Sequence, residues 1–131
     1  MINKLSRRLL LVSTLASILA VKLAVAATPA FDQATFERLQ HDGKPTLLMI
    51  HASWCPTCKA QEPLIDTLLK QPENQAITAL RVDFDSQKNV VRHFKVTQQS
   101  TLIVFKDGKE VGRSTGDTRK EGIAALLKKA V

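Results

Sequence analysis

Hydrophobic positions along the chain switch repeatedly between helical and extended spacing. Residues 31–39 carry apolar side chains at helical spacing, and Asp32 is a residue type that favours the position just before a helix. Residues 46–52 (TLLMIHA) form a nearly continuous apolar run, which is typical of a central strand buried on both faces. Helical spacing returns over residues 55–71. The inward face of this second helix is predicted to consist of Ala60, Leu64, Ile65, Leu68 and Leu69.

The second half of the chain continues the alternation and ends in a hairpin. Residues 77–84 predict a strand, and a short helix is expected through Val90, Val91 and Phe94. Asp107-Gly108 is a strong hairpin signal between strands at 101–105 and 110–115. A final amphipathic helix is predicted over 118–129. This order predicts an α/β fold with a central mixed four-stranded sheet flanked by helices.

Residues 1–26 have the pattern of a secretory signal peptide. A basic start is followed by an uncharged, mostly apolar run over 9–21 and then by small residues, so cleavage is predicted near Ala26 or Ala27. An uncleaved membrane anchor is the alternative, but Lys22 interrupts the apolar run well short of the ~20 residues that a span requires. We therefore expect a periplasmic protein that meets the membrane only through its signal peptide, with residues 27–131 forming one domain.

Charge gives little support for nucleic-acid binding. The formal net charge of the chain is +7, and loss of the four basic residues of the signal peptide lowers it to +3. The remaining Lys and Arg residues are scattered among acids rather than clustered. No nucleic-acid partner is therefore expected, and the domain is expected to act as a monomer.

The only two cysteines, Cys55 and Cys58, stand where the first predicted strand passes into a helix. Free backbone N–H groups and the helix dipole favour negative charge at that place, so a thiol there ionises more readily than usual. A second thiol three residues later can displace a mixed disulfide formed at the first. We assign Cys55 as the attacking nucleophile and Cys58 as the resolving thiol, with a redox-active disulfide between them and no further cofactor.

The motif W-C-P-T-C-K at residues 54–59, placed after a buried strand, resembles the thioredoxin family. The resemblance covers almost all of residues 27–131. Pro63 stands at the family's helix-kinking proline, Asp85 and the F-K-D-G run at 105–108 are in register, and Gly116 falls at the family's late glycine. It implies a thioredoxin-like fold and a protein-disulfide oxidoreductase acting on protein thiols or disulfides. It also implies an envelope protein as electron donor or acceptor.

Two departures from the family affect the surroundings of the cysteines. Ser100 replaces the family's cis-proline, and a cis peptide bond before a residue other than proline costs ~2.5–4 kcal/mol, so the Gln99–Ser100 bond is expected to be trans. The serine hydroxyl could donate a hydrogen bond to the thiolate. Met49 replaces the buried aspartate thought to move the proton of the resolving thiol. Arg81, at the position of that acid's usual partner, is expected to pair with a nearby acid such as Asp83.

His51, four residues before Cys55, occupies a position that is usually aromatic in the family. It could tune the pKa of a nearby thiolate, or it could be a half-buried histidine hydrogen-bonded to backbone. Residues expected to contact substrate surround the motif and the loop before the third strand. They are Trp54, Pro56, Thr57, Gln99, Ser100, Thr101 and Gly116.

Two other functions stay open at this point. His51, Cys55 and Cys58 could together bind a soft ion such as Cu(I) or Zn²⁺. Alternatively, the surface around Trp54 and residues 98–99 could hold a partner without catalysis, although a pure binding module has no need of either sulfur.

Overall fold

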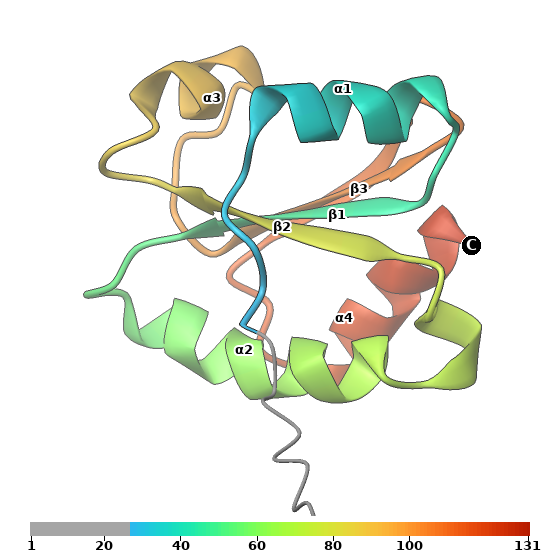
Figure 1. Ribbon diagram of the computed structural model, residues 1–131. Coiled ribbons are helices and arrows are strands. Elements are labelled where there is room, and N and C mark those ends of the chain that lie inside the picture. Colours follow the sequence, from blue (N-terminus) through green and yellow to red (C-terminus); the bar gives the residue numbers. More distant parts are fainter. Residues whose placement is uncertain (1–26) are drawn as a thin grey trace, which may run out of the picture.

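The computed structural model describes residues 27–131, so the predicted signal peptide lies outside the described residues. The described chain folds around one four-stranded sheet of order β2-β1-β3-β4, in which β1 and β2 run parallel and β3 is antiparallel to both β1 and β4 (Figure 1). This confirms the predicted mixed sheet. The elements in chain order are α1 (Gln33–His41), β1 (Thr46–His51), α2 (Pro56–Leu69), η1 (Pro72–Asn74), β2 (Thr78–Asp83), α3 (Lys88–His93), β3 (Thr101–Lys106), β4 (Lys109–Thr115), α4 (Lys120–Leu127) and η2 (Lys128–Ala130).

Helices cover both faces of the sheet, α1 and α3 on one side and α2 and α4 on the other (Figure 1). Because successive side chains of a strand point to opposite faces, β1 contributes to both cores. Leu47 and Met49 pack with residues of α2 and α4, whereas Leu48 and Ile50 pack with residues of α1 and α3. The first five residues of β1 are buried, as predicted for a central strand. No helix in residues 27–131 is long and apolar enough to cross a membrane.

Helix α2 turns the predicted face to the core except at Ala60: Leu64 and Leu69 are partly buried against the core that contains Ile65 and Leu68. Its buried residues are Cys58, Gln61, Ile65 and Leu68, while Ala60 is exposed. The prediction of Ala60 as an inward residue was therefore wrong. The buried set follows the helical repeat that starts at Cys58, so the polar side chain of Gln61 lies in the interior and Ala60 does not.

A backbone segment before α1 extends the sheet beyond β2. The N–H of Phe31 donates to the carbonyl of Arg81 at 2.7 Å, and the N–H of Arg81 donates to the carbonyl of Pro29 at 2.8 Å. Ala30 therefore pairs in parallel with Arg81 as an isolated bridge. This pairing covers part of the edge of β2. The pattern of apolar residues gave no sign of it.

Candidate functional site

The two cysteines lie where β1 ends and α2 begins, and both are free thiols. Cys55 is the N-cap of α2: its Sγ accepts a hydrogen bond from the N–H of Cys58 at 3.1 Å. Pro56 occupies the first helical position, where a backbone N–H would have no partner within the helix, so proline is tolerated there. Both side chains are nearly covered, Cys55 at 2% and Cys58 at 3% exposure. Exposure therefore does not distinguish the two thiols.

Ser100 reaches both sulfurs with a single hydroxyl. Its Oγ lies 3.0 Å from Cys55 Sγ and 3.2 Å from Cys58 Sγ. The Gln99–Ser100 peptide bond is trans, as predicted, since no cis bond occurs among the described residues. The position that the family fills with a proline is thus occupied here by a polar hydrogen-bonding group in contact with the reacting atoms.

The backbone at Ser100 is held in the left-handed region, with φ at +63°. A residue other than glycine pays a steric cost there, because its Cβ approaches its own backbone. Both backbone groups of Ser100 are bonded: its N–H donates to the carbonyl of Ile50 at 2.8 Å, and its carbonyl accepts from the N–H of Gly116 at 3.0 Å. Gly116 itself has φ at +74°, a conformation that suits glycine.

A third hydrogen bond to the Ser100 turn comes from Gln61, a residue that the sequence analysis missed. Its Nε2 donates to the carbonyl of Ser100 at 3.2 Å and to the carbonyl of Asp117 at 2.9 Å. The side chain is buried, with 3% exposure. One signal could have found it: a glutamine three residues after Cys58 and four before Ile65, on the apolar side of the helix.

The surroundings of the two thiols shift their pKa values in opposite directions. Burial alone raises the pKa of Cys55, but hydrogen bonds from Cys58 and Ser100 and from the backbone at Cys58 and Thr57 outweigh it and leave the pKa below its ordinary value. Burial also raises the pKa of Cys58, and the hydrogen bond with Cys55 raises it further, so it stays above the ordinary value despite Ser100. Cys55 is therefore the thiol that ionises first.

Charged residues form a separate cluster beside Met49. Glu62 Oε1 lies 2.5 Å from Arg81 Nη2 and 3.2 Å from His51 Nε2, and all three side chains are partly buried. The predicted pairing of Arg81 with Asp83 was wrong, because Asp83 instead accepts hydrogen bonds in the turn after β2. Met49 is buried in the apolar core between the sheet and α2, directly across from Arg81 in the β1–β2 register.

The histidine and the cysteines do not form a metal site. His51 is directed at Glu62, and no group of three His, Cys, Asp or Glu side chains within residues 27–131 could hold an ion. The three-ligand alternative therefore has no geometric support. The influence of His51 on the thiolate stays a prediction.

Some of the residues predicted to contact substrate are exposed, and others are buried. Trp54 is 56% exposed and its Nε1 donates to Asp85 Oδ2 at 2.7 Å, which fixes the indole beside the motif. Pro56 and Gly116 are exposed, and Thr57 and Gln99 are partly so. Thr101 is buried, its hydroxyl contacts the carbonyl of Gln98 and Thr115 Oγ1, and its backbone pairs with β1 and β4.

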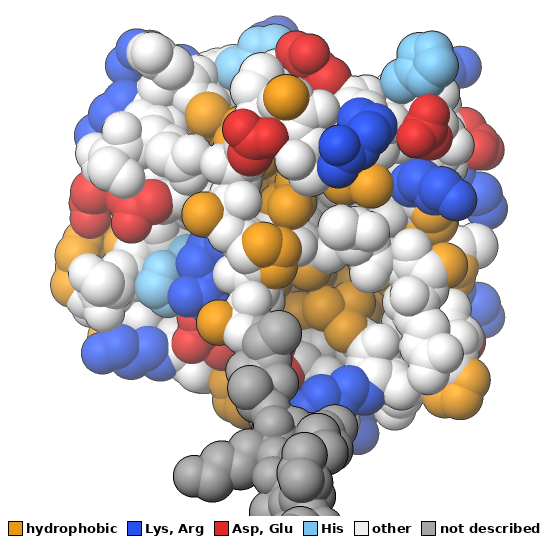
Figure 2. Space-filling model, in the orientation of Figure 1, with side chains coloured by type: hydrophobic (Ala, Val, Ile, Leu, Met, Phe, Trp, Pro, Cys, Tyr) orange, Lys and Arg blue, Asp and Glu red, His pale blue; other side chains and the backbone are white. Residues whose placement is uncertain are grey.

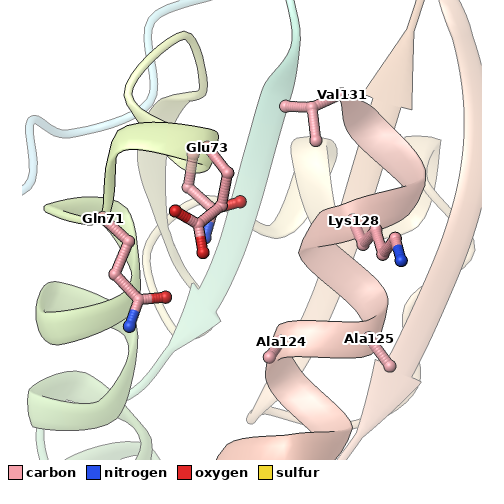
Figure 3. A pocket seen from close by; sticks show the side chains of 7 residues that line it. Gln71, Glu73, Ala124, Ala125, Lys128 and Val131 are labelled. Atoms are coloured by element: carbon pink, nitrogen blue, oxygen red, sulfur yellow. The ribbon is translucent and has the colours of Figure 1, made fainter.

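Other surface features lie away from the thiols. A hollow of about 560 Å³ is bordered by Gln71 and Glu73 on one side and by Ala124 and Lys128 of the C-terminal segment on the other (Figure 3). It lies at the far end of α2 from the cysteines, because Gln71 follows the end of that helix. On the face in Figure 2, basic and acidic side chains interleave.

Comparison with known proteins agrees with this geometry. The thioredoxin family model matches residues 22–129. The chain belongs to the thioredoxin family. It is 37% identical to the thioredoxin of Chlamydia trachomatis over 83 residues, which are 63% of this chain and 79% of that protein. The thioredoxin of Mycobacterium tuberculosis is 35% identical over 85 residues, covering 65% of this chain and 70% of the relative.

Solved structures of thioredoxins share the fold. The crystal structure of Trxlp from Edwardsiella tarda superposes with a TM-score of 0.75 at 38% identity, covering 77% of this chain and 98% of that one. The protein is thus a thioredoxin-family thiol–disulfide oxidoreductase with Cys55 and Cys58 as its cysteine pair.

Proposed function

We propose that this thioredoxin acts in the periplasm, where it exchanges electrons with exported proteins through Cys55 as attacking thiol and Cys58 as resolving thiol. The observation that carries the assignment of roles is the capping of α2 by Cys55 Sγ, which accepts from the N–H of Cys58 at 3.1 Å. A thiolate at that position is stabilised by the backbone and the helix dipole before any substrate arrives. The location is supported by the signal-like pattern of residues 1–26.

In the reducing direction, the Cys55 thiolate attacks one sulfur of a substrate disulfide. A bond forms between Cys55 and that sulfur, the substrate disulfide breaks, and the leaving thiolate takes a proton from water. Cys58 then gives its proton to water and attacks Cys55 Sγ, which forms the Cys55–Cys58 disulfide and releases the second substrate thiolate. The cysteine pair loses two electrons and the Cys58 proton; the substrate gains the two electrons and, through water, one proton on its first sulfur, while its second sulfur leaves as a thiolate. The oxidising direction is the same sequence in reverse.

The second step takes place without a buried acid next to the resolving thiol. Met49, which stands at the position of that acid, is an apolar residue buried in the core, and burial is the main factor that keeps the pKa of Cys58 high. The hydroxyl of Ser100 is the polar side chain that contacts Cys58 Sγ. We therefore expect the resolving step to be slow compared with the first attack.

The substrate surface consists of the exposed residues around the motif, with Trp54 as an aromatic platform and Pro56, Thr57, Gln99 and Gly116 beside it. Its partners are protein thiols or disulfides, together with an envelope protein that supplies or accepts electrons. The proposed active unit is a monomer, since a single chain by itself brings Cys55, Cys58 and the Ser100 hydroxyl together.

Trapping tests this function directly. A Cys58→Ser variant of the full chain, expressed in its own cell, should accumulate mixed disulfides at Cys55 with periplasmic proteins, visible as reducible bands after acid quenching. Cys55→Ser is the matched control and should trap few or none. Equal trapping by both variants would refute the assignment of roles, and fractionation that finds the protein in the cytosol would refute the location.

A further inference from the structure

The side chain of Gln61 occupies a position where the helix repeat calls for an apolar residue. Its neighbours on the buried face of α2 are Cys58, Ile65 and Leu68. A buried amide without partners costs free energy, so a polar group in such a place needs specific hydrogen bonds. Gln61 has them, because the two hydrogens of its Nε2 meet two carbonyl groups, those of Ser100 and Asp117.

These two carbonyls belong to the two loops that meet at the cysteines. Ser100 ends the loop before β3, and Asp117 lies in the loop between β4 and α4. Gln61 therefore ties both loops to the helix whose first turn carries the sulfurs. The N–H of Gly116, next to Asp117, donates to the same Ser100 carbonyl, which completes the link.

The link holds a strained residue in place. Non-glycine residues in the left-handed region persist only where their surroundings determine the conformation, and such residues cluster at active sites. Ser100 is one of three of them among the described residues, and the other two, Lys95 and Asp107, are away from the sulfurs at loop and hairpin positions. The proline of the family is rigid by its own ring, whereas a serine depends on its neighbours.

We propose that Gln61 is a positioning residue for the thiol chemistry. Its buried amide fixes the conformation of the Ser100 turn, so that the Ser100 hydroxyl can donate a hydrogen bond first to Cys55 Sγ and then to Cys58 Sγ. The inference rests on the proposed function and extends it. Ser100 touches the reacting atoms and is the catalytic residue of the pair; Gln61 acts only through Ser100.

A hydroxyl has one donor and two acceptor sites, so its direction can follow the charge. In the reduced protein, Ser100 O–H and the Cys58 thiol both donate to the Cys55 thiolate, and Ser100 Oγ stays within 3.2 Å of Cys58 Sγ. Once Cys55 is bound in a mixed disulfide, it carries no charge, and the proton of Cys58 passes to water. The hydroxyl then turns and donates to the Cys58 thiolate, which is the nucleophile of the second step.

The test is the pH dependence of iodoacetamide modification of Cys55 in the purified reduced protein, followed by mass spectrometry. Gln61→Met keeps the size of the side chain and removes the donor. We expect its rate at pH 7 to fall several-fold, up to about the tenfold that loss of a hydrogen bond to a charged group gives. The midpoint of the pH profile should move to higher pH. The double variant Ser100→Ala/Gln61→Met should have the same pH profile of Cys55 modification as Ser100→Ala alone.

Asn74→Leu is the matched control. Asn74 is a second buried side-chain amide, located in η1 beyond the end of α2 that is far from the cysteines, and it donates to the carbonyl of Leu68 at 3.0 Å. It should lower the melting temperature and leave the Cys55 profile unchanged. If Gln61→Met does not fold, Gln61→Asn, which shortens the reach to both carbonyls, replaces it with the same expectation.

Two results would overturn the role of Gln61: an unchanged Cys55 profile in the variant, or an equal change in the presence and absence of the Ser100 hydroxyl. Both leave the proposed function intact. The proposed function fails instead if wild-type Cys55 reacts no faster than Cys58 at neutral pH.

Discussion

The two sides of the cysteine pair are built from different kinds of groups. On the side of the loop before β3, the sulfurs meet a neutral hydroxyl that is held by backbone and by a buried amide. Beside Met49, across the β1–β2 pairing, lies a cluster in which Glu62 binds both Arg81 and His51, and none of its hydrogen bonds or ion pairs involves either sulfur. The hydroxyl of Ser100 contacts the reacting sulfurs, whereas the charged side chains on the other side pair with one another.

The thiolate of Cys55 is stabilised by hydrogen-bond donors and not by a cation. Hydrogen-bond donors with fixed positions act at short range, and salt screens them little when they are buried. An ion pair at partly exposed side chains is weakened by salt and contributes modestly. We therefore expect the reactivity of Cys55 to depend on Ser100 and to be nearly independent of ionic strength and of the charged cluster.

The largest effect should follow removal of the hydroxyl. In Ser100→Ala, Cys55 loses a donor at 3.0 Å, and its rate of modification at pH 7 should fall roughly tenfold, as expected for a hydrogen bond to a charged group. Ser100→Gly is the control for strain, because it removes the same hydroxyl but suits φ at +63°. It should show the same chemical loss and be about 1 kcal/mol more stable than Ser100→Ala in denaturant unfolding. If Cys55 reacted at the wild-type rate in both variants, the Ser100 hydroxyl would not be the group that stabilises its thiolate.

The next effect is a pH dependence of stability with opposite sign for the two thiols. The folded pKa of Cys55 lies below its ordinary value of ~8.5, so the stability that it adds is present above that value and is lost as the pH falls through the folded pKa. The folded pKa of Cys58 is raised, so its contribution is present below ~8.5 and is lost as the pH rises through the folded pKa.

Thermal unfolding of single-cysteine variants measures the two contributions separately. Relative to the variant without cysteines, and with a reducing agent present, Cys58→Ser should gain stability from pH 6 to 9. Cys55→Ser should be flat over the lower part of that range and lose stability at its alkaline end. Parallel curves for the two variants would show that the thiols are equivalent.

A smaller effect is expected from the charged cluster. Glu62→Gln removes the carboxylate shared by Arg81 and His51 and should cost about 1 kcal/mol of unfolding free energy at low salt, with less difference at high salt. The pH profile of Cys55 should stay as in wild type. Glu73→Gln, at an exposed position near the end of α2, is the matched control and should change neither quantity. A shifted pH profile of Cys55 in Glu62→Gln, with none in Glu73→Gln, would show that the charged cluster influences the pKa of the thiol.

The sequence predicted the fold almost completely, since each helix and strand left its own local repeat of apolar residues. The strand at 46–52 and the hairpin at Asp107-Gly108 are examples, and both appear within about two residues of the prediction. The cysteine pair was equally readable, because its chemistry depends on a strand-to-helix transition that the same repeats locate. The trans bond before Ser100 followed from the absence of proline.

What could not be predicted was the choice of partner for each polar group. Arg81 binds Glu62, 19 residues before it, although Asp83 shares its face of β2, because the Asp83 carboxylate already accepts hydrogen bonds in the turn after the strand. Gln61 was not singled out from the sequence, and its carbonyl partner at Asp117 lies 56 residues away. Such pairings are set by how the elements pack, which no local repeat records.

The smallest effect should arise at Asp85, whose carboxylate is hydrogen-bonded to the tryptophan of the cysteine motif. Asp85 Oδ2 accepts from Trp54 Nε1 at 2.7 Å, but both side chains are exposed, so Asp85→Ala should cost only about 0.5 kcal/mol. Trp54 is the only tryptophan, so its fluorescence anisotropy reports the loss directly and should fall as the indole becomes free to rotate. Asp85→Asn keeps a carbonyl acceptor and should retain the wild-type anisotropy. If the division between neutral and charged sides holds, both variants leave the pH profile of Cys55 in place, because Asp85 orients the substrate platform and contacts neither sulfur.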